Sequence, residues 1–205
     1  SSRFPYYMNN YGFHTIHGRA PTIATGLRVS RPELQVWVIT GDGDGLSIGG
    51  NHLMHCLRRN IDVKILLFNN RIYGLTKGQF SATADLGSTL KTGISNKLPP
   101  IDTCSLAIQL GATLVARSFS GDKKQLQAVF KAAMGHRGTA VIDVISPCVT
   151  FANNDESYRS YNYVKGNDEI LHILVYGWGN RQRNASDTEA TGILPFYCIV
   201  HRVGP

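Results

Sequence analysis

The 205-residue sequence has few cysteines, and they are far apart. They are Cys56, Cys104, Cys148 and Cys198, so it contains neither a Cys-x-x-Cys pair nor a zinc-finger spacing. This pattern favours a reducing compartment, and we expect a cytoplasmic protein. No stretch approaches the roughly 20 apolar residues that cross a membrane, and no charged-then-apolar secretory leader opens the sequence. Because the sequence begins without Met, we expect it to be N-terminally truncated.

Acidic residues are also scarce. The sequence has 14 Asp and Glu against 21 Lys and Arg, a net charge of +7 that favours an anionic ligand or an acidic partner. The basic residues are scattered, and no pattern of aromatic and basic residues typical of nucleic-acid recognition occurs, so we predict no nucleic-acid partner. With 42% hydrophobic and 17% charged residues, the composition is that of a globular chain with one main core.

Apolar runs and helical patterns alternate from residue 18 to residue 145. The runs typical of strands are 34–40, 63–68, 113–116 and 140–145, and the helical patterns are 18–30, 47–60, 103–110 and 123–134. This alternation predicts an α/β fold with a mainly parallel sheet and helices on both faces. Residues 69–100 have no clear period and indicate a long, functional loop. In such sheets ligands bind at the carboxyl ends of the strands.

The segment GDGDGLSIGG, residues 41–50, follows an apolar run and leads into a helical pattern. It lacks the third glycine of the dinucleotide fingerprint, the Gly-Lys-Ser/Thr of a Walker loop and the later acidic ligands of a calcium loop. What remains is a glycine turn before a helix N-terminus, which can receive a diphosphate. Because the carboxylates of Asp42 and Asp44 would repel a diphosphate, we expect Mg²⁺ between the carboxylates and the diphosphate. Asn69-Asn70 can complete its shell, since adjacent strands lie about 4.8 Å apart.

Gly-Asp-Gly followed by Asn-Asn just under thirty residues later resembles the thiamine-diphosphate-binding motif. The fuller string GDGDGLSIGGNHLMHCLRRN...LLFNNRIYGLTKGQ resembles the β subunits of 2-oxoacid:ferredoxin oxidoreductases, the family of the 2-oxoglutarate and pyruvate enzymes. YGFHTIHGRAPTIATGLR upstream and AVIDVISPCVTF downstream fit the same family. The resemblance covers about residues 1–165, which we interpret as a thiamine-diphosphate-binding domain. Residues 166–205 match nothing in the family and are interpreted as a tail of unknown role.

The resemblance implies a magnesium site made by the side chains of Asp42 and Asn70 and the main-chain carbonyl of Ile72. The interval of 28 residues from Asp42 to Asn70 fits the family better than the 26 from Asp44. Gly43 and Asp44 would lie against the diphosphate, Asp44 through its backbone N–H. The alternative role for Asp44 is that of a carboxylate at a helix N-terminus.

The segment IYGLTKGQ, residues 72–79, is implied to wrap the cofactor and face the substrate. Thr76 would donate to a phosphate oxygen, and Lys77 would pair with the substrate carboxylates unless it is a solvated loop lysine. His17, our second catalytic candidate, would approach the same pocket. Further cofactor contacts are implied for Gly18, Arg19, Tyr73, Gly74 and Leu75.

The family carries out CoA-dependent oxidative decarboxylation of a 2-oxoacid, and electrons pass through a 4Fe–4S cluster to ferredoxin. The resemblance implies that activity needs the α subunit, which supplies the pyrimidine-binding half. Cys148 would be one cluster ligand, with a structural thiol as the alternative. Because the family's other cluster cysteines lie upstream of this sequence, the ligand set is incomplete. An incomplete or silent diphosphate-binding fragment without redox activity is therefore the alternative function.

Overall fold

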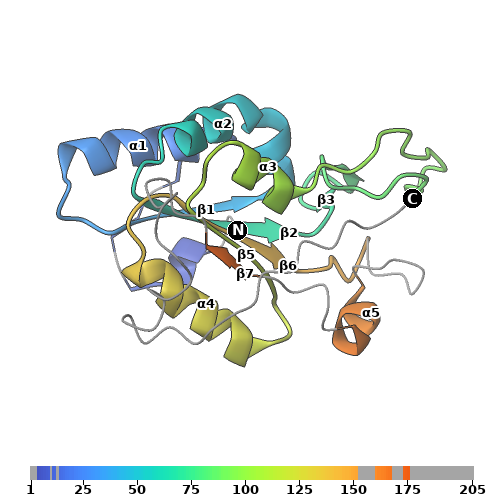
Figure 1. Ribbon diagram of the computed structural model, residues 1–205. Helices are drawn as coiled ribbons and strands as arrows, with labels where there is room; N and C mark the ends of the chain where they lie inside the picture. The colour runs from blue at the N-terminus through green and yellow to red at the C-terminus, as the bar shows by residue number, and fades with distance from the viewer. Residues whose placement is uncertain (1–3, 10, 13, 152–159, 168–172, 176–205) are drawn as a thin grey trace.

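The computed structural model describes residues 4–9, 11–12, 14–151, 160–167 and 173–175. In these residues a five-stranded sheet has the order β1-β2-β6-β5-β7 (Figure 1). The strands are β1 (Val36–Gly41), β2 (Val63–Asn69), β5 (Leu114–Phe119), β6 (Ala140–Ile145) and β7 (Ile173–Val175). All neighbours are parallel except β7, which pairs antiparallel with β5. The predicted mainly parallel sheet is confirmed.

Helices cover both faces of this sheet. α1 (Ala20–Ser30), α2 (Gly50–Arg58) and α3 (Thr103–Gln109) lie on one face, and α4 (Lys123–Gly135) lies on the other (Figure 1). Further helical elements of the described residues include a short α5 (Tyr161–Gly166) and a 3-10 turn, η1 (Phe4–Tyr6). Among these helices, none combines the length and the apolar character that a bilayer crossing needs.

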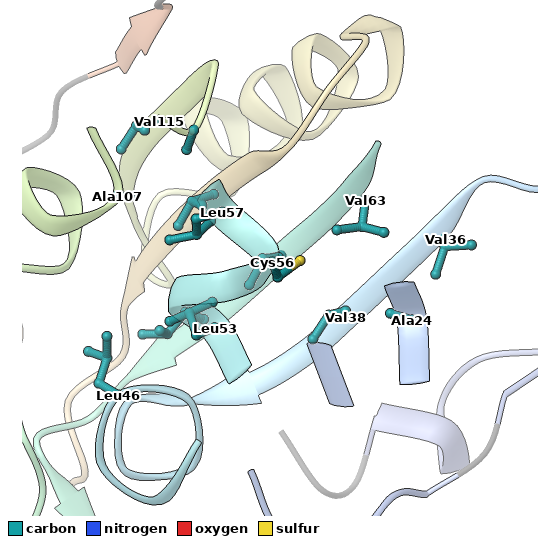
Figure 2. Close-up of a cluster of buried hydrophobic side chains, with 14 residues drawn as sticks. Ala24, Val36, Val38, Leu46, Leu53, Cys56, Leu57, Val63, Ala107 and Val115 are labelled. Carbon is teal, nitrogen blue, oxygen red and sulfur yellow. The ribbon is translucent and has the colours of Figure 1, made fainter. Parts of the chain in front are cut away.

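Each face of the sheet has its own apolar core. Under α1, α2 and α3 the buried side chains include Ala24, Val38, Leu53, Leu57, Val63 and Val115 (Figure 2). Under α4 they include Leu66, Ala116, Val129, Ala133 and Ile142. The central strand β6 is buried at every position, whereas the edge strand β1 alternates between buried and partly exposed residues. Burial on both faces explains why the central strands have uninterrupted apolar sequences.

Several element boundaries differ from the sequence-based expectation. The segment predicted as one helix over 47–60 consists of a π-helical turn, η2 (Gly43–Ile48), followed by α2. The predicted strand 113–116 extends to Phe119, because polar side chains in its second half find hydrogen-bond partners, Asp143 for Arg117 and Gln125 for Ser118. Residues 69–100 are not wholly irregular, since β3 (Ile72–Tyr73) and β4 (Gln79–Phe80) form a hairpin.

The tail overlaps the described residues only in part. β7 falls within the apolar stretch of residues 169–179 and adds a strand beside β5. The remainder of residues 168–205, including Cys198, lies outside the described residues. The proposed division at residue 165 therefore stays a prediction.

A buried polar cluster closes the amino-terminal edge of the sheet, away from the glycine turn. Lys64 is 2% exposed, and its ammonium donates to Asp62 Oδ1 at 2.6 Å and to the carbonyl oxygens of His136 at 2.7 Å and Gly138 at 3.1 Å. His136 Nε2 lies 2.7 Å from Thr113 Oγ1. These contacts hold the loop before β6 against β2 and β5.

The imidazole of His136 is expected to make stability fall under mildly acidic conditions. Burial, followed by the charge of Lys64, lowers the pKa of His136 below its ordinary value. The unfolded chain therefore binds a proton near about pH 6.5, whereas the folded protein binds it only at lower pH. The free energy of unfolding should decrease as the pH drops from about 6.5 towards the lowered pKa. Urea unfolding above and below this range should show a smaller decrease for His136→Gln, and equal decreases would contradict the assignment.

Candidate functional site

The carboxyl ends of β1 and β2 bring the two halves of the glycine-aspartate motif together. Asp42 directly follows β1, and Asn69 is the last residue of β2. The backbone N–H of Asn70 lies 3.4 Å from Asp42 Oδ1, so the interval of 28 residues ends in a direct contact. The backbone N–H of Ser146, just after β6, donates to the Asn69 carbonyl at 2.9 Å. Three strand ends thus meet at this edge, because parallel strands point their carboxyl ends the same way.

Asp42 is a buried carboxylate surrounded by neutral donors. It is 1% exposed, and its Oδ2 accepts hydrogen bonds from Ser81 Oγ at 2.5 Å and Thr83 Oγ1 at 2.6 Å. Burial raises the pKa of Asp42, although these hydroxyls and the Asn70 N–H act in the opposite direction. The described contacts of this carboxylate include no cationic side chain. A buried anion in such surroundings is stabilised by a bound cation.

Asn70 and Ile72 lie next to this carboxylate. Asn70 Oδ1 accepts a hydrogen bond from the Ile72 N–H at 3.1 Å, which is a side-chain turn that fixes the start of β3. The Asn70 amide oxygen keeps a second lone pair, and the Asp42 carboxylate offers Oδ1. Carboxylate and amide oxygens are hard ligands that suit Mg²⁺, so the residues present fit the implied metal.

The glycine turn η2 brings its backbone close to Tyr73. The Tyr73 hydroxyl donates to the Gly43 carbonyl at 2.6 Å, and a Cβ added to Gly43 would lie 2.6 Å from the Tyr73 ring. Glycine is therefore required at this position unless the ring moves. Leu46 of the same turn packs into the core beside α2 (Figure 2), which anchors the turn to the domain.

Asp44 has a role different from that of Asp42. Its Oδ1 accepts from the Gly18 N–H at 2.7 Å and lies 2.8 Å from His17 Nδ1, and its Oδ2 accepts from Thr40 Oγ1 at 2.5 Å. Asp44 is also in the first turn of η2, so it occupies the helix N-terminal position considered as its alternative role. Its side chain ties the His-Gly-Arg corner to the glycine turn. No pattern in the sequence indicated the contact of Thr40 with Asp44.

The His-Gly-Arg corner is packed closely against the motif. Gly18 has φ of 75°, and a Cβ on it would lie 2.8 Å from the Gly49 backbone. The His17 ring lies 5.9 Å from the Tyr73 ring, centroid to centroid. Arg19 instead contacts His52, a residue of α2 that also lies 2.8 Å from Thr22. Of this corner, His17 and Gly18 adjoin the turn and Tyr73, whereas the Arg19 side chain joins α1 to α2.

The turn of the β3–β4 hairpin carries the predicted substrate-facing residues. Leu75 is 83% exposed, and Thr76 and Lys77 are exposed as well. The Thr76 hydroxyl bonds to the Gln79 side chain, and Gln79 Nε2 donates to the Thr76 carbonyl at 2.7 Å. Lys77 has φ of 77° and extends from this turn without burial. Its exposure suits both a substrate-binding cation and a solvated loop lysine, so its role stays a prediction.

Cys148 lies at the same edge of the sheet, three residues after β6. Its carbonyl accepts from the Phe151 N–H at 3.2 Å, and a Cβ on Gly78 would lie 3.2 Å from the Phe151 ring. The Cys148 turn therefore adjoins the hairpin that carries Lys77. Cys56 is buried under α2, where burial raises the pKa of its thiol.

The ligands of an iron–sulfur cluster are not gathered in the described part of the chain. Those residues contain no group of three or more His, Cys, Asp or Glu side chains able to hold a metal. Cys104 is on α3 and Cys56 is on α2, whereas Cys148 follows β6. The described cysteines therefore do not fit a four-cysteine cluster, and the role of Cys148 stays a prediction.

The amino-acid sequence of this chain is similar to those of known proteins. The model of the thiamine pyrophosphate enzymes, C-terminal TPP-binding domain, matches residues 1–144. The 2-oxoglutarate oxidoreductase subunit KorB of Mycobacterium tuberculosis is 51% identical over 183 residues, which cover 86% of this chain and 48% of that protein. The 2-oxoglutarate synthase subunit KorB of Methanocaldococcus jannaschii is 43% identical over 195 residues, covering 94% and 70% respectively.

A solved structure agrees with these sequence matches. The 2-oxoglutarate:ferredoxin oxidoreductase from Magnetococcus marinus, with 2-oxoglutarate, coenzyme A and succinyl-CoA bound, superposes with a TM-score of 0.75 at 40% identity. The match covers 81% of this chain and 56% of that one, so the chain spans about half the length of several relatives. The chain therefore belongs to the thiamine pyrophosphate enzymes, in the family of the KorB, or β, subunits of 2-oxoacid:ferredoxin oxidoreductases.

Proposed function

We propose that this chain supplies the diphosphate-binding half of a 2-oxoacid:ferredoxin oxidoreductase and binds magnesium thiamine diphosphate at the carboxyl edge of its sheet. The observation that carries the proposal is the contact between Asn70 and the buried Asp42 carboxylate, 3.4 Å across the ends of two parallel strands. Family membership adds the expectation of a thiamine pyrophosphate site in this domain.

The proposed magnesium ligands are the side chains of Asp42 and Asn70 and the main-chain carbonyl of Ile72. Gly43, which has no side chain, would let the diphosphate lie against the backbone of η2. Bound thiamine diphosphate would supply the electron sink that a 2-oxoacid needs for decarboxylation. The chain's own residues bind and orient it, and the ion offsets the repulsion between Asp42 and the diphosphate.

The residues around this edge have separate proposed roles. Tyr73 and the exposed hairpin turn, Gly74 to Thr76, would cover the cofactor, with Gly18 and Arg19 beside it. Lys77 would pair with a substrate carboxylate, because it is a cation at the exposed tip of that turn. His17 would act in the same pocket, held at Nδ1 by Asp44 at 2.8 Å.

The substrates and partners follow by similarity. The Magnetococcus marinus structure contains 2-oxoglutarate, coenzyme A and succinyl-CoA, so we propose a 2-oxoacid of this class and coenzyme A as substrates here. An α subunit would complete the site, and ferredoxin would accept the electrons in the cytoplasm. Cys148 is proposed as one cluster ligand. No reaction step is assigned to the cluster, because the described residues do not supply its ligand set.

The proposed activity predicts a defined set of requirements. Joined to the upstream segment that carries the remaining cluster cysteines in the family, this chain in complex with its α subunit should reduce a viologen dye or ferredoxin only when a 2-oxoacid, coenzyme A, Mg²⁺ and thiamine diphosphate are all present. We expect 2-oxoglutarate to give the highest rate, and pyruvate is the comparison. A complex that binds the cofactor but reduces no acceptor with any 2-oxoacid would favour the alternative, a silent diphosphate-binding domain.

A further inference from the structure

Two hydroxyl groups bind one oxygen of the buried Asp42 carboxylate and leave lone pairs of the other oxygen without a hydroxyl partner. Ser81 Oγ and Thr83 Oγ1 both donate to Oδ2, at 2.5 Å and 2.6 Å. Among the hydrogen bonds of the described residues, Oδ1 has the longer contact of 3.4 Å to the Asn70 N–H. The two oxygens of one carboxylate are thus in different environments. Only Oδ1 is available to a cation.

Thr83 also connects Asp42 to the neighbouring strand. Its hydroxyl, which is 0% exposed, lies 2.8 Å from Asn69 Oδ1 as well as 2.6 Å from Asp42. Asn69 Nδ2 donates to Asp143 Oδ1 at 3.0 Å, and Arg117 Nε donates to Asp143 Oδ2 at 3.0 Å. The Thr83 hydroxyl has one hydrogen, which it donates to Asp42, so its approach to Asn69 Oδ1 is a close polar contact. Together with the two hydrogen bonds of Asp143, this contact links the motif through β2 and β6 to β5. The positively charged residue of this network, Arg117, contacts Asp143 and not Asp42 in the described contacts.

The segment that carries these hydroxyls is itself fixed. The Ala82 N–H donates to Ser47 Oγ of η2 at 3.1 Å, and the Ala82 carbonyl accepts from the Ile101 N–H at 2.8 Å. Ser81 and Thr83 flank Ala82, and the backbone contacts of Ala82 therefore fix the positions of both residues next to the motif. A carboxylate that is rigidly oriented loses less freedom when it binds a metal, which favours binding.

We propose that Ser81 and Thr83 are positioning residues for the metal site, which hold Oδ2 of Asp42 so that Oδ1 alone binds the ion. This inference rests on the proposed function, because it assumes that Asp42 is a magnesium ligand. Hydrogen-bond partners of metal ligands typically contribute 10–100-fold to metal affinity. Hydroxyl groups suit this task better than a lysine or arginine, because they orient the carboxylate without neutralising the charge that attracts Mg²⁺.

The test compares Thr83→Val with Thr83→Ser in the complex with the α subunit. With thiamine diphosphate saturating, Mg²⁺ is titrated and its apparent dissociation constant is measured from cofactor binding and from turnover. Thr83→Val should raise this constant about 10–100-fold and keep kcat at saturating Mg²⁺ within a few-fold, and Thr83→Ser should restore affinity. If Thr83 had a purely structural role, adding Mg²⁺ would not restore the kcat of Thr83→Val.

Thr103→Val is the matched control, because Thr103 is 2% exposed and its hydroxyl has no hydrogen-bond partner among the described residues. It should leave the Mg²⁺ constant unchanged. If Thr83→Val does not fold, Ser81→Ala removes the other hydroxyl and should weaken Mg²⁺ binding in the same way.

The two levels of the proposal fail in different ways. Wild-type Mg²⁺ affinity in both Thr83→Val and Ser81→Ala, together with loss of binding in Asp42→Asn, would overturn the positioning role and leave the metal ligand in place. Wild-type affinity in Asp42→Asn itself would overturn the proposed function.

Discussion

Replacing Asp42 with Asn should reduce turnover by more than about 100-fold, because the loss of a hydrogen-bond partner alone commonly costs a metal site 10–100-fold. The same change should stabilise the metal-free protein. Burial raises the pKa of Asp42, so its ionised form costs stability at pH values above that pKa and the cost disappears below the unfolded value. Asparagine is neutral and can still accept from Ser81 and Thr83. Urea unfolding without Mg²⁺ should therefore show a higher midpoint for Asp42→Asn.

Asp122→Asn provides the matched control for this substitution. Asp122 caps α4 by accepting from the Gln125 N–H at 3.0 Å, and an asparagine there keeps the cap. It should change neither turnover nor the unfolding midpoint appreciably. An Asp42→Asn protein that is as active as this control would show that Asp42 is not a metal ligand. A lower unfolding midpoint would show that its charge does not cost stability in the folded state.

Replacing Asp44 with Ala should have the opposite effect on stability. The change leaves the buried Gly18 N–H without its acceptor, and the Thr40 hydroxyl keeps only its longer contact of 3.3 Å to the Gly41 carbonyl. An unsatisfied buried group costs about 1–3 kcal/mol, so we expect a loss of about 1–3 kcal/mol in the free energy of unfolding. Turnover should fall as well, because His17 loses its partner at 2.8 Å. Urea unfolding and steady-state kinetics measure the two effects.

Asp44→Asn serves as the comparison, since its amide oxygen can accept one of these bonds and should retain part of the stability. We therefore expect different losses at the two aspartates. Replacing Asp42 should mainly affect cofactor binding, and replacing Asp44 should mainly affect the stability of the fold. An Asp44→Ala protein with wild-type stability and no Mg²⁺ affinity would reverse this assignment.

The sequence was sufficient to predict the layers of the fold and the pairing of the two halves of the motif. The central strands are covered on both faces, so their uninterrupted apolar runs were recognisable without a structure. The position of both segments after parallel strands indicated that they meet, and the resemblance to the family selected Asp42 and Asn70 within them. These features depend on local pattern and on topology, which the sequence encodes directly.

The rest of the site depends on contacts that no local pattern encodes. Ser81 and Thr83 lie in an aperiodic segment, and they reach Asp42 only because the β3–β4 hairpin turns the chain back. The second half of β5 was missed because Arg117 is polar, and its burial depends on the distant Asp143. The link between Asp44 and Gly18 likewise requires the folded corner. Such pairs are separated by many residues and carry no periodic signal.

The most direct test of the central claim is a calorimetric titration of thiamine diphosphate, in the presence of Mg²⁺, into the complex of this chain with its α subunit. We expect saturable, Mg²⁺-dependent binding to the wild-type complex and no detectable binding to the Asp42→Asn complex. Equal affinity of the two complexes for the cofactor would contradict the assignment of the metal site to the contact between Asp42 and Asn70.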